Sequence, residues 1–180
     1  MNIGSMYTEA EAYVQRFHTR NPYELLDSIG AIVIRSYEYE PDGLKGFSTI
    51  SKRSLFAVIN GHLNDVEQRI VAGHEAAHLI LHKREILASS AQTLKDFDLF
   101  RCVGKLERQA NSFLADFLVS DDEVANVLTS ENTNYFNASR ELMLPPPLFA
   151  FKLYSMMHRG HSARNPVDLQ SSVLGKSENW

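Results

Sequence analysis

Two histidines one helical turn apart, with a glutamate directly after the first, lie inside a long apolar stretch of this chain. The segment reads His74-Glu75-Ala76-Ala77-His78, an HExxH motif between the largely apolar residues 66–73 and 79–81. Because residues four apart share one face of an α-helix, both imidazoles can reach the same metal ion. Glu75 points to a different side of the helix, where it can contact a water molecule held by that ion. The spacing predicts a buried helix that carries the zinc site of a hydrolase.

A catalytic zinc ion takes three protein ligands and keeps a fourth position open, so a third ligand is required. Glu107 is the best candidate, because it falls on the apolar face of a second amphipathic helix over residues 106–118. A carboxylate buried there needs a compensating cation, which a metal ion supplies. We therefore predict that His74, His78 and Glu107 bind Zn²⁺, although such a ligand set also accepts Mn²⁺ or Fe²⁺.

Other polar residues are predicted to act around this site rather than to bind the metal. Asn111 lies one turn beyond Glu107 and is expected to hydrogen-bond a ligating imidazole. His82 lies one turn beyond the motif but is rotated away from the first histidine, so we expect it to support a ligand or the fold. His158 and His161 lie near an expected helix end and are interpreted as solvated or capping residues.

Four segments occur in a characteristic order along the chain. Residues 43–46 read Gly-Leu-Lys-Gly, residues 56–60 read Phe-Ala-Val-Ile-Asn, the HExxH motif follows, and residues 107–115 contain Glu-x-x-Ala-Asn-x-Phe-x-Ala. In this order and spacing the chain resembles the ImmA/IrrE metallo-endopeptidases, a gluzincin-like family of zinc proteases. The resemblance covers most of residues 22–160. It implies a zincin-type active site in which the downstream glutamate is the third zinc ligand.

The resemblance also assigns roles and a biological setting. It implies zinc ligation by His74, His78 and Glu107, and catalysis by Glu75. Several members of the family cleave a helix-turn-helix repressor, so it further implies that the partner of this chain is a protein substrate of that kind. Zinc would lower the pKa of its bound water towards ~7, and Glu75 would accept the proton and pass it to the leaving amine.

This chain departs from the family pattern at two places. Ala77 stands where the family has glycine, and Leu-Val-Ser at residues 118–120 replaces Leu-Met-Pro. Neither departure removes a ligand, and Ala77 requires room for only one methyl group.

Two further classes of function remain open beside the endopeptidase. The chain could be a metal-stabilised module that inactivates a repressor by holding it, with little or no hydrolysis. An intact Glu75 favours the enzyme, because metal ligation alone does not need an acid at that position. The other class is a transcription factor that acts directly on DNA. The net charge of -4 and the pI near 6.0 argue against it.

Composition predicts a cytoplasmic protein without a membrane segment. The 180 residues, 44% of them hydrophobic, are enough for one domain with a substantial core. No segment reaches the roughly 18 uninterrupted apolar residues of a membrane helix, and the start of the chain lacks the features of a signal peptide. The single cysteine, Cys102, is interpreted as a free thiol in a reducing compartment.

The sequence predicts an α+β fold in which a small, mainly antiparallel sheet packs on the active-site helices. We expect one domain over residues 1–180, with a catalytic core (1–120), a helical C-terminal part (121–161) and a partly disordered tail (162–180). The predicted helices cover 7–18, 22–29, 121–128, 135–144 and 148–158, and the predicted strands cover 31–37, 46–51 and 55–60.

Two connections carry expectations of their own. The segment from 84 to 104 is interpreted as a connector with a short helix around residues 91–100. The three prolines at 145–147 are placed in the turn before the last helix. DNA binding by that helix is not expected, because Lys152 and Arg159 are the only fixed positive charges between residues 148 and 160.

Overall fold

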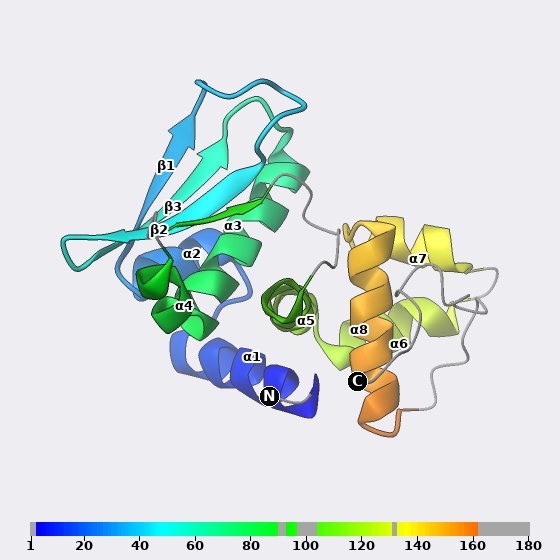
Figure 1. The fold of residues 1–180 in the computed structure, drawn as a ribbon. Coiled ribbons are helices and arrows are strands. Elements are labelled where there is room, and N and C mark those ends of the chain that lie inside the picture. Colours follow the sequence, from blue (N-terminus) through cyan, green and yellow to red (C-terminus); the bar gives the residue numbers. More distant parts are fainter. Residues whose placement is uncertain (1–2, 90–92, 97–103, 131–132, 162–180) are drawn as a thin grey trace.

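The computed structural model describes residues 3–89, 93–96, 104–130 and 133–161 (Figure 1). Its elements are α1 (Ile3–Phe17), α2 (Pro22–Ser28), β1 (Ala31–Ser36), β2 (Gly46–Ser51), β3 (Ser54–Asn60), α3 (Asp65–Leu81), α4 (Lys83–Ala88), β4 (Thr93–Asp96), α5 (Lys105–Leu118), α6 (Asp121–Thr129), α7 (Tyr135–Glu141) and α8 (Pro146–His158). The predicted α+β class is confirmed. Cys102 and the tail from 162 to 180 lie outside the described residues. Within the described part of the chain, no helix has the length and apolarity required to cross a membrane.

The sheet is small and mixed, with the strand order β1-β3-β2-β4. β1 runs parallel to β3, so that Ala31 lies opposite Leu55 and Ser36 lies opposite Asn60. β2 is antiparallel to both β3 and β4. The sheet is therefore mainly antiparallel, as predicted, and β2 is an inner strand that can lie against α3.

The hairpin between β2 and β3 has a two-residue turn. Ser51 pairs with Ser54, which leaves only Lys52 and Arg53 to make the turn. Both have positive φ, 47° and 67°, as a type I′ turn requires. Asn-Gly is the preferred pair in such turns because other residues in this conformation are strained. The turn is nevertheless compatible with the right-handed twist of the two strands.

The segment between α3 and α5 differs from the prediction of a connector with a helix around residues 91–100. Residues 83–88 form α4, and residues 93–96 form β4, which pairs antiparallel with β2 from Gly46 opposite Asp96 to Thr49 opposite Thr93. Residues 91–92 and 97–100 lie outside the described part. The predicted helix is thus wrong at residues 93–96. Pairing with the open edge of β2 satisfies backbone groups on both strands, and this tertiary gain overrides local helical preference.

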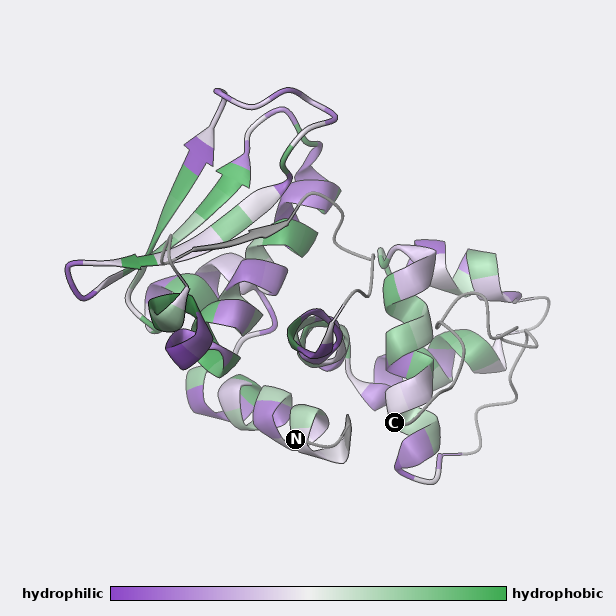
Figure 2. Cartoon of the chain, viewed as in Figure 1, coloured by the Kyte–Doolittle hydropathy of each residue, from purple (hydrophilic) through white to green (hydrophobic). Residues whose placement is uncertain are grey.

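Helix α3 lies between the sheet and α5 (Figure 1). A capping box defines its start. The side chain of Asn64 accepts a hydrogen bond from the backbone N–H of Glu67, and the side chain of Glu67 accepts one from the backbone N–H of Asn64. A Cβ atom at Gly73 would lie 2.4 Å from Leu114 Cδ1, so a side chain there would force Leu114 to shift where α3 and α5 approach each other closely. The apolar sides of the helices face each other and the sheet (Figure 2).

Helix α6 begins at Asp121, where a helix was predicted to begin. Ser120 caps α6 through a second capping box, with Glu123. The placement of all three prolines in the turn was wrong, because α8 starts at Pro146 and Pro147 lies in its first turn. Proline is accepted there because the first turn of a helix has no intrahelical acceptor for its backbone N–H groups.

A buried ion network joins α8 to α5 and α6. The Nζ atom of Lys152 lies 3.0 Å from Asp116 Oδ1 and 2.8 Å from Asp121 Oδ1, and the Lys152 and Asp116 side chains are fully buried. Arg159 forms two hydrogen bonds with the carboxylate of Asp121, at 2.5 and 2.9 Å. Ser155 donates to the second oxygen of Asp116 at 2.6 Å. The positive charges of Lys152 and Arg159, in and directly after the last helix, are therefore paired with carboxylates of the same chain.

Candidate metal centre

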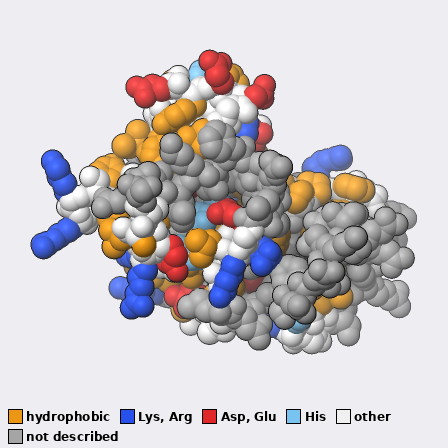
Figure 3. All heavy atoms as spheres, viewed as in Figure 1, with side chains coloured by type: hydrophobic (Ala, Val, Ile, Leu, Met, Phe, Trp, Pro, Cys, Tyr) orange, Lys and Arg blue, Asp and Glu red, His pale blue; other side chains and the backbone are white. Residues whose placement is uncertain are grey.

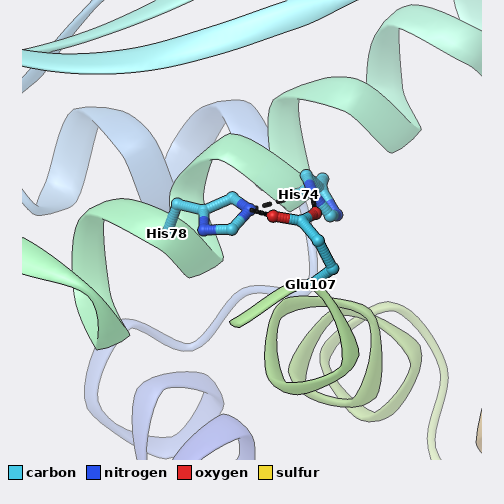
Figure 4. Close-up of side chains that lie close together, drawn as sticks. All are labelled: His74, His78 and Glu107. Atoms are coloured by element: carbon cyan, nitrogen blue, oxygen red, sulfur yellow. Dashed lines mark hydrogen bonds and ion pairs between the residues drawn. The ribbon is translucent and has the colours of Figure 1, made fainter. Parts of the chain in front are cut away.

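The predicted ligands come together from two neighbouring helices. His74 and His78 project from α3, and Glu107 reaches them from the first turn of α5 (Figure 4). The two imidazoles are fully buried, whereas the Glu107 side chain is 22% exposed. The site is thus protected by the core on one side and accessible through Glu107 on the other.

The spacing of the three donor atoms suits a metal ion. The Nε2 atoms of His74 and His78 lie 3.0 Å apart. Nε2 of His74 lies 3.1 Å from Oε2 of Glu107, and Nε2 of His78 lies 3.5 Å from Oε1 of Glu107. Ligands about 2.1 Å from a tetrahedral zinc ion would stand about 3.4 Å from one another. One donor atom from each residue lies within 4.8 Å of the others. The three residues therefore fit one small cation with little movement.

The hydrogen bond from His74 to Asn111 strengthens this conclusion. Nδ1 of His74 lies 3.1 Å from Oδ1 of Asn111, as predicted, and an amide oxygen can only accept. His74 therefore donates its Nδ1–H and, when neutral, directs the lone pair of Nε2 towards Glu107. A lone pair and a carboxylate oxygen 3.1 Å apart repel each other unless a cation lies between them. Either a proton or a metal ion satisfies this requirement.

His82 supports His78 and does not join the ligand cluster, as predicted. Its Nδ1 lies 3.0 Å from Nδ1 of His78, and its Nε2 lies 3.2 Å from Oε1 of Gln109 on α5. Burial lowers the pKa of His82, and the neighbouring His78 lowers it further. The His82 ring is consequently held in its neutral form, in which one nitrogen donates and the other accepts.

Glu107 is held as a carboxylate. Partial burial by itself raises the pKa of Glu107, but its close contacts with the imidazoles of His74 and His78 outweigh the effect of burial and hold the pKa well below its ordinary value. An ionised carboxylate is the form that ligates a metal. The site therefore combines two imidazoles and one negative charge.

Glu75 lies on the side of α3 that faces the sheet. It is fully buried, and its Oε2 accepts a hydrogen bond of 2.7 Å from the hydroxyl of Ser48 on β2. A Cβ atom at Gly46 would lie 2.9 Å from Oε1 of Glu75 and 2.5 Å from Val71, so β2 can approach the helix only with glycine at that position. Strand β2 therefore contacts the Glu75 carboxylate in two ways, through the hydrogen bond from Ser48 and the close approach of Gly46.

Sequence reasoning missed Ser48 and Gln109. Alternation along β2 places Ser48 on the same face as Gly46 and Ile50, so strand periodicity could have pointed to it. No comparable signal exists for Gln109, because its partner belongs to a different helix. His158 and His161 lie outside the cluster, where His158 contacts the Tyr154 ring and His161 lies 3.3 Å from Asp121.

The sheet packs on α3, which carries two histidines one turn apart, and α5 adds a carboxylate beside them. These are features of the metallopeptidase class of proteins. Comparison with known families gives the particular group. The Peptidase_M78 family model, described as the IrrE N-terminal-like domain, matches residues 31–154, and the chain belongs to this family.

A relative among curated proteins is similar over most of its length. It is the "Uncharacterized immunity region protein 2" of Bacillus phage phi105, which is 36% identical over 132 residues, covering 71% of this chain and 78% of the relative. No solved structure gives a significant match.

Proposed function

We propose that this protein is a cytoplasmic, zinc-dependent endopeptidase that hydrolyses a peptide bond in a regulatory protein, a helix-turn-helix repressor. The observation that carries the proposal is the convergence of the three donor atoms of His74, His78 and Glu107, with separations that suit one tetrahedral cation. Membership of the IrrE N-terminal-like family supports peptide-bond hydrolysis as the reaction.

Each residue of the site has a distinct task in this proposal. His74, His78 and Glu107 hold the ion, and Asn111 keeps His74 in the tautomer that a metal needs. When bound, zinc supplies Lewis acidity, which polarises the scissile carbonyl and makes water easier to deprotonate. Glu75 takes the proton from the attacking water and transfers it to the leaving amine.

The hydrogen bond from Ser48 suits Glu75 to the role of general base. Oε2 of the buried Glu75 carboxylate accepts from the Ser48 hydroxyl at 2.7 Å, and this bond fixes the orientation of the carboxylate. A carboxylate held in this way can take a proton from the attacking water and return it to the leaving amine.

The regulatory substrate is supported by the phage relative, whose name assigns it to an immunity region. The ion pairs of Lys152 and Arg159 with Asp121 support a protein partner rather than DNA, because these charges are not available to phosphates. On the face shown in Figure 3, the Lys and Arg side chains of the described residues stand in several separate places and do not form one basic surface.

Strand β4 offers a way to bind an extended peptide. It is an outer strand of the sheet and lies next to β2. Ser48 of β2 donates the hydrogen bond to Glu75. A substrate segment that adds along β4 would be held by main-chain hydrogen bonds with little demand on its sequence. A structure of a substrate complex in which the peptide forms no strand pairing would overturn this binding mode.

The function is tested by incubating the zinc-loaded protein with candidate helix-turn-helix repressors, and by following fragments with mass spectrometry. The wild type and the control Glu141→Gln, which changes an exposed glutamate on α7, are expected to cleave at one site. Glu75→Gln is expected to retain zinc and to yield no fragments. A complex without fragments from the wild type would support a metal-stabilised binding module instead. Full activity of Glu75→Gln would remove the assigned base.

A further inference from the structure

The two imidazole ligands are supported in different ways. His74 donates to an amide oxygen of Asn111 directly, whereas the Nδ1 atom of His78 meets a second imidazole, Nδ1 of His82, at 3.0 Å. Two ring nitrogens at this distance can share only one proton, so one of them donates and the other accepts. The direction of this hydrogen bond decides which nitrogen of His78 carries the lone pair.

The direction of the hydrogen bond between His78 and His82 is set by Gln109, the partner of the other His82 nitrogen. Nε2 of His82 lies 3.2 Å from Oε1 of Gln109, and an amide oxygen can only accept. Neutral His82 therefore has its proton on Nε2 and its lone pair on Nδ1. His78 must then donate its Nδ1–H, which leaves the lone pair of its Nε2 directed at His74 and Glu107.

We propose that Gln109 and His82 form a relay that sets the tautomer of His78, so that Nε2 of His78 is presented as a metal ligand. The relay, defined as Gln109, His82 and His78, runs from α5 to the end of α3 and back into the site. Gln109 and His82 are positioning residues, because they act through His78. The proposal rests on the proposed function in one respect, namely that the atom presented at Nε2 binds a metal ion.

The relay also explains why His82 is buried beside the site although it is not a ligand. His82 is 2% exposed and makes one hydrogen bond with each of its ring nitrogens, to His78 and to Gln109. Partners in this position commonly change metal affinity by about 10- to 100-fold when they are removed. Reversal of the relay would place a proton on Nε2 of His78, where it competes directly with the metal.

Four variants of the 180-residue chain separate this role from general support of the fold. Gln109→Leu removes the terminal acceptor, and His82→Phe keeps a ring but removes both nitrogens. Gln109→Glu keeps an acceptor and, unlike glutamine, has no NH₂ group that could reverse the direction. The matched control is Gln68→Leu, which deletes a buried glutamine on α3 that donates to the carbonyl of Leu63, away from the ligands.

The first measurement is the dissociation constant for Zn²⁺, obtained by competition with a chelator. We expect Gln109→Leu and His82→Phe to raise it about 10- to 100-fold. Gln109→Glu and Gln68→Leu should stay near the wild type, even if Gln68→Leu lowers the thermal midpoint. Unchanged affinity in both relay variants, or an equal loss in the Gln68→Leu control, would overturn the relay.

The second measurement does not depend on metal binding. Nitrogen-15 spectra of the imidazole rings in the metal-free protein, above the pH at which they titrate, distinguish a protonated from an unprotonated ring nitrogen. We expect His78 to be protonated at Nδ1 in the wild type and in Gln109→Glu, and to shift towards Nε2 protonation in Gln109→Leu. A wild type with Nε2 protonation would refute the relay. A wild type with the expected tautomer but no zinc affinity would refute the proposed function and leave the relay intact.

Discussion

The hydroxyl of Ser48 donates a hydrogen bond of 2.7 Å to Oε2 of Glu75, and both side chains are fully buried. The bond connects the inner strand β2 with helix α3, and it is one contact between the sheet and the residue proposed as the general base. Orientation of that carboxylate thus depends on a strand that contributes no metal ligand.

Replacing Ser48 with alanine should therefore impair turnover without releasing metal. A hydrogen bond to a charged group contributes about 1.5–3 kcal/mol, so we expect kcat for repressor cleavage to fall about 10-fold or more. Zinc content should be unchanged, because Ser48 does not contact a predicted ligand. Ser48→Thr, which keeps the hydroxyl, is the matched comparison. Equal turnover in all three proteins would show that the bond does not position Glu75.

Glu107→Ala should abolish stoichiometric zinc binding. The substitution removes the only predicted ligand from α5 and leaves two imidazoles, which is one ligand fewer than a catalytic zinc site has. Elemental analysis after dialysis against metal-free buffer should give about one zinc per wild-type chain and far less for the variant. Glu38→Ala, at an exposed position before β2, should retain the wild-type content. Failure of the wild type to take up zinc would contradict the metal site itself.

Asp121 should stabilise the protein in a pH-dependent way. Partial burial raises the pKa of Asp121, but hydrogen bonds and charges from Arg159 and Lys152 outweigh it and hold the pKa well below its ordinary value. Because the unfolded chain then takes up a proton first on acidification, this stabilisation is complete above about pH 5 and is lost as the pH falls towards the folded pKa.

Urea unfolding of Asp121→Asn measures this contribution. At pH 7 the variant should be less stable than the wild type by about 3 kcal/mol, because Lys152 and Arg159 lose a charged partner. The difference should shrink steadily below about pH 4. An exposed aspartate on the same helix, changed in Asp122→Asn, provides the control. A stability difference that stays constant from neutral to acidic pH would contradict the ion-pair explanation.

The β2–β3 turn offers a stabilising change. Lys52 and Arg53 both adopt positive φ, which costs each non-glycine residue about 1 kcal/mol. The double change Lys52→Asn and Arg53→Gly introduces the pair that type I′ turns prefer, so the free energy of unfolding should rise by about 1–2 kcal/mol. Thermal and urea unfolding would detect this gain. A loss of stability would mean that the two long side chains make contacts that offset the strain of the turn.

Most of the local structure could be predicted from the sequence. Caps such as Ser120 and the alternation or helical periodicity of apolar residues act over a few neighbouring positions, and the elements they predicted are present. One error concerns an element that depends on a distant partner, because strand β4 forms along the edge that β2 offers it. The other error is local, because α8 begins at Pro146, which the first turn of a helix can accept.

The sequence by itself determined that His74 and His78 share one face of a helix, because that relationship follows from a spacing of four residues. It also indicated Glu107 as their partner, since a carboxylate on an apolar helix face requires a cation. Only the tertiary structure decided how these groups are held. Ser48 lies 27 residues from Glu75 in the chain, and Gln109 lies 27 residues from His82. Contacts at such separations arise from the packing of β2 and α5 against α3, which no local pattern records.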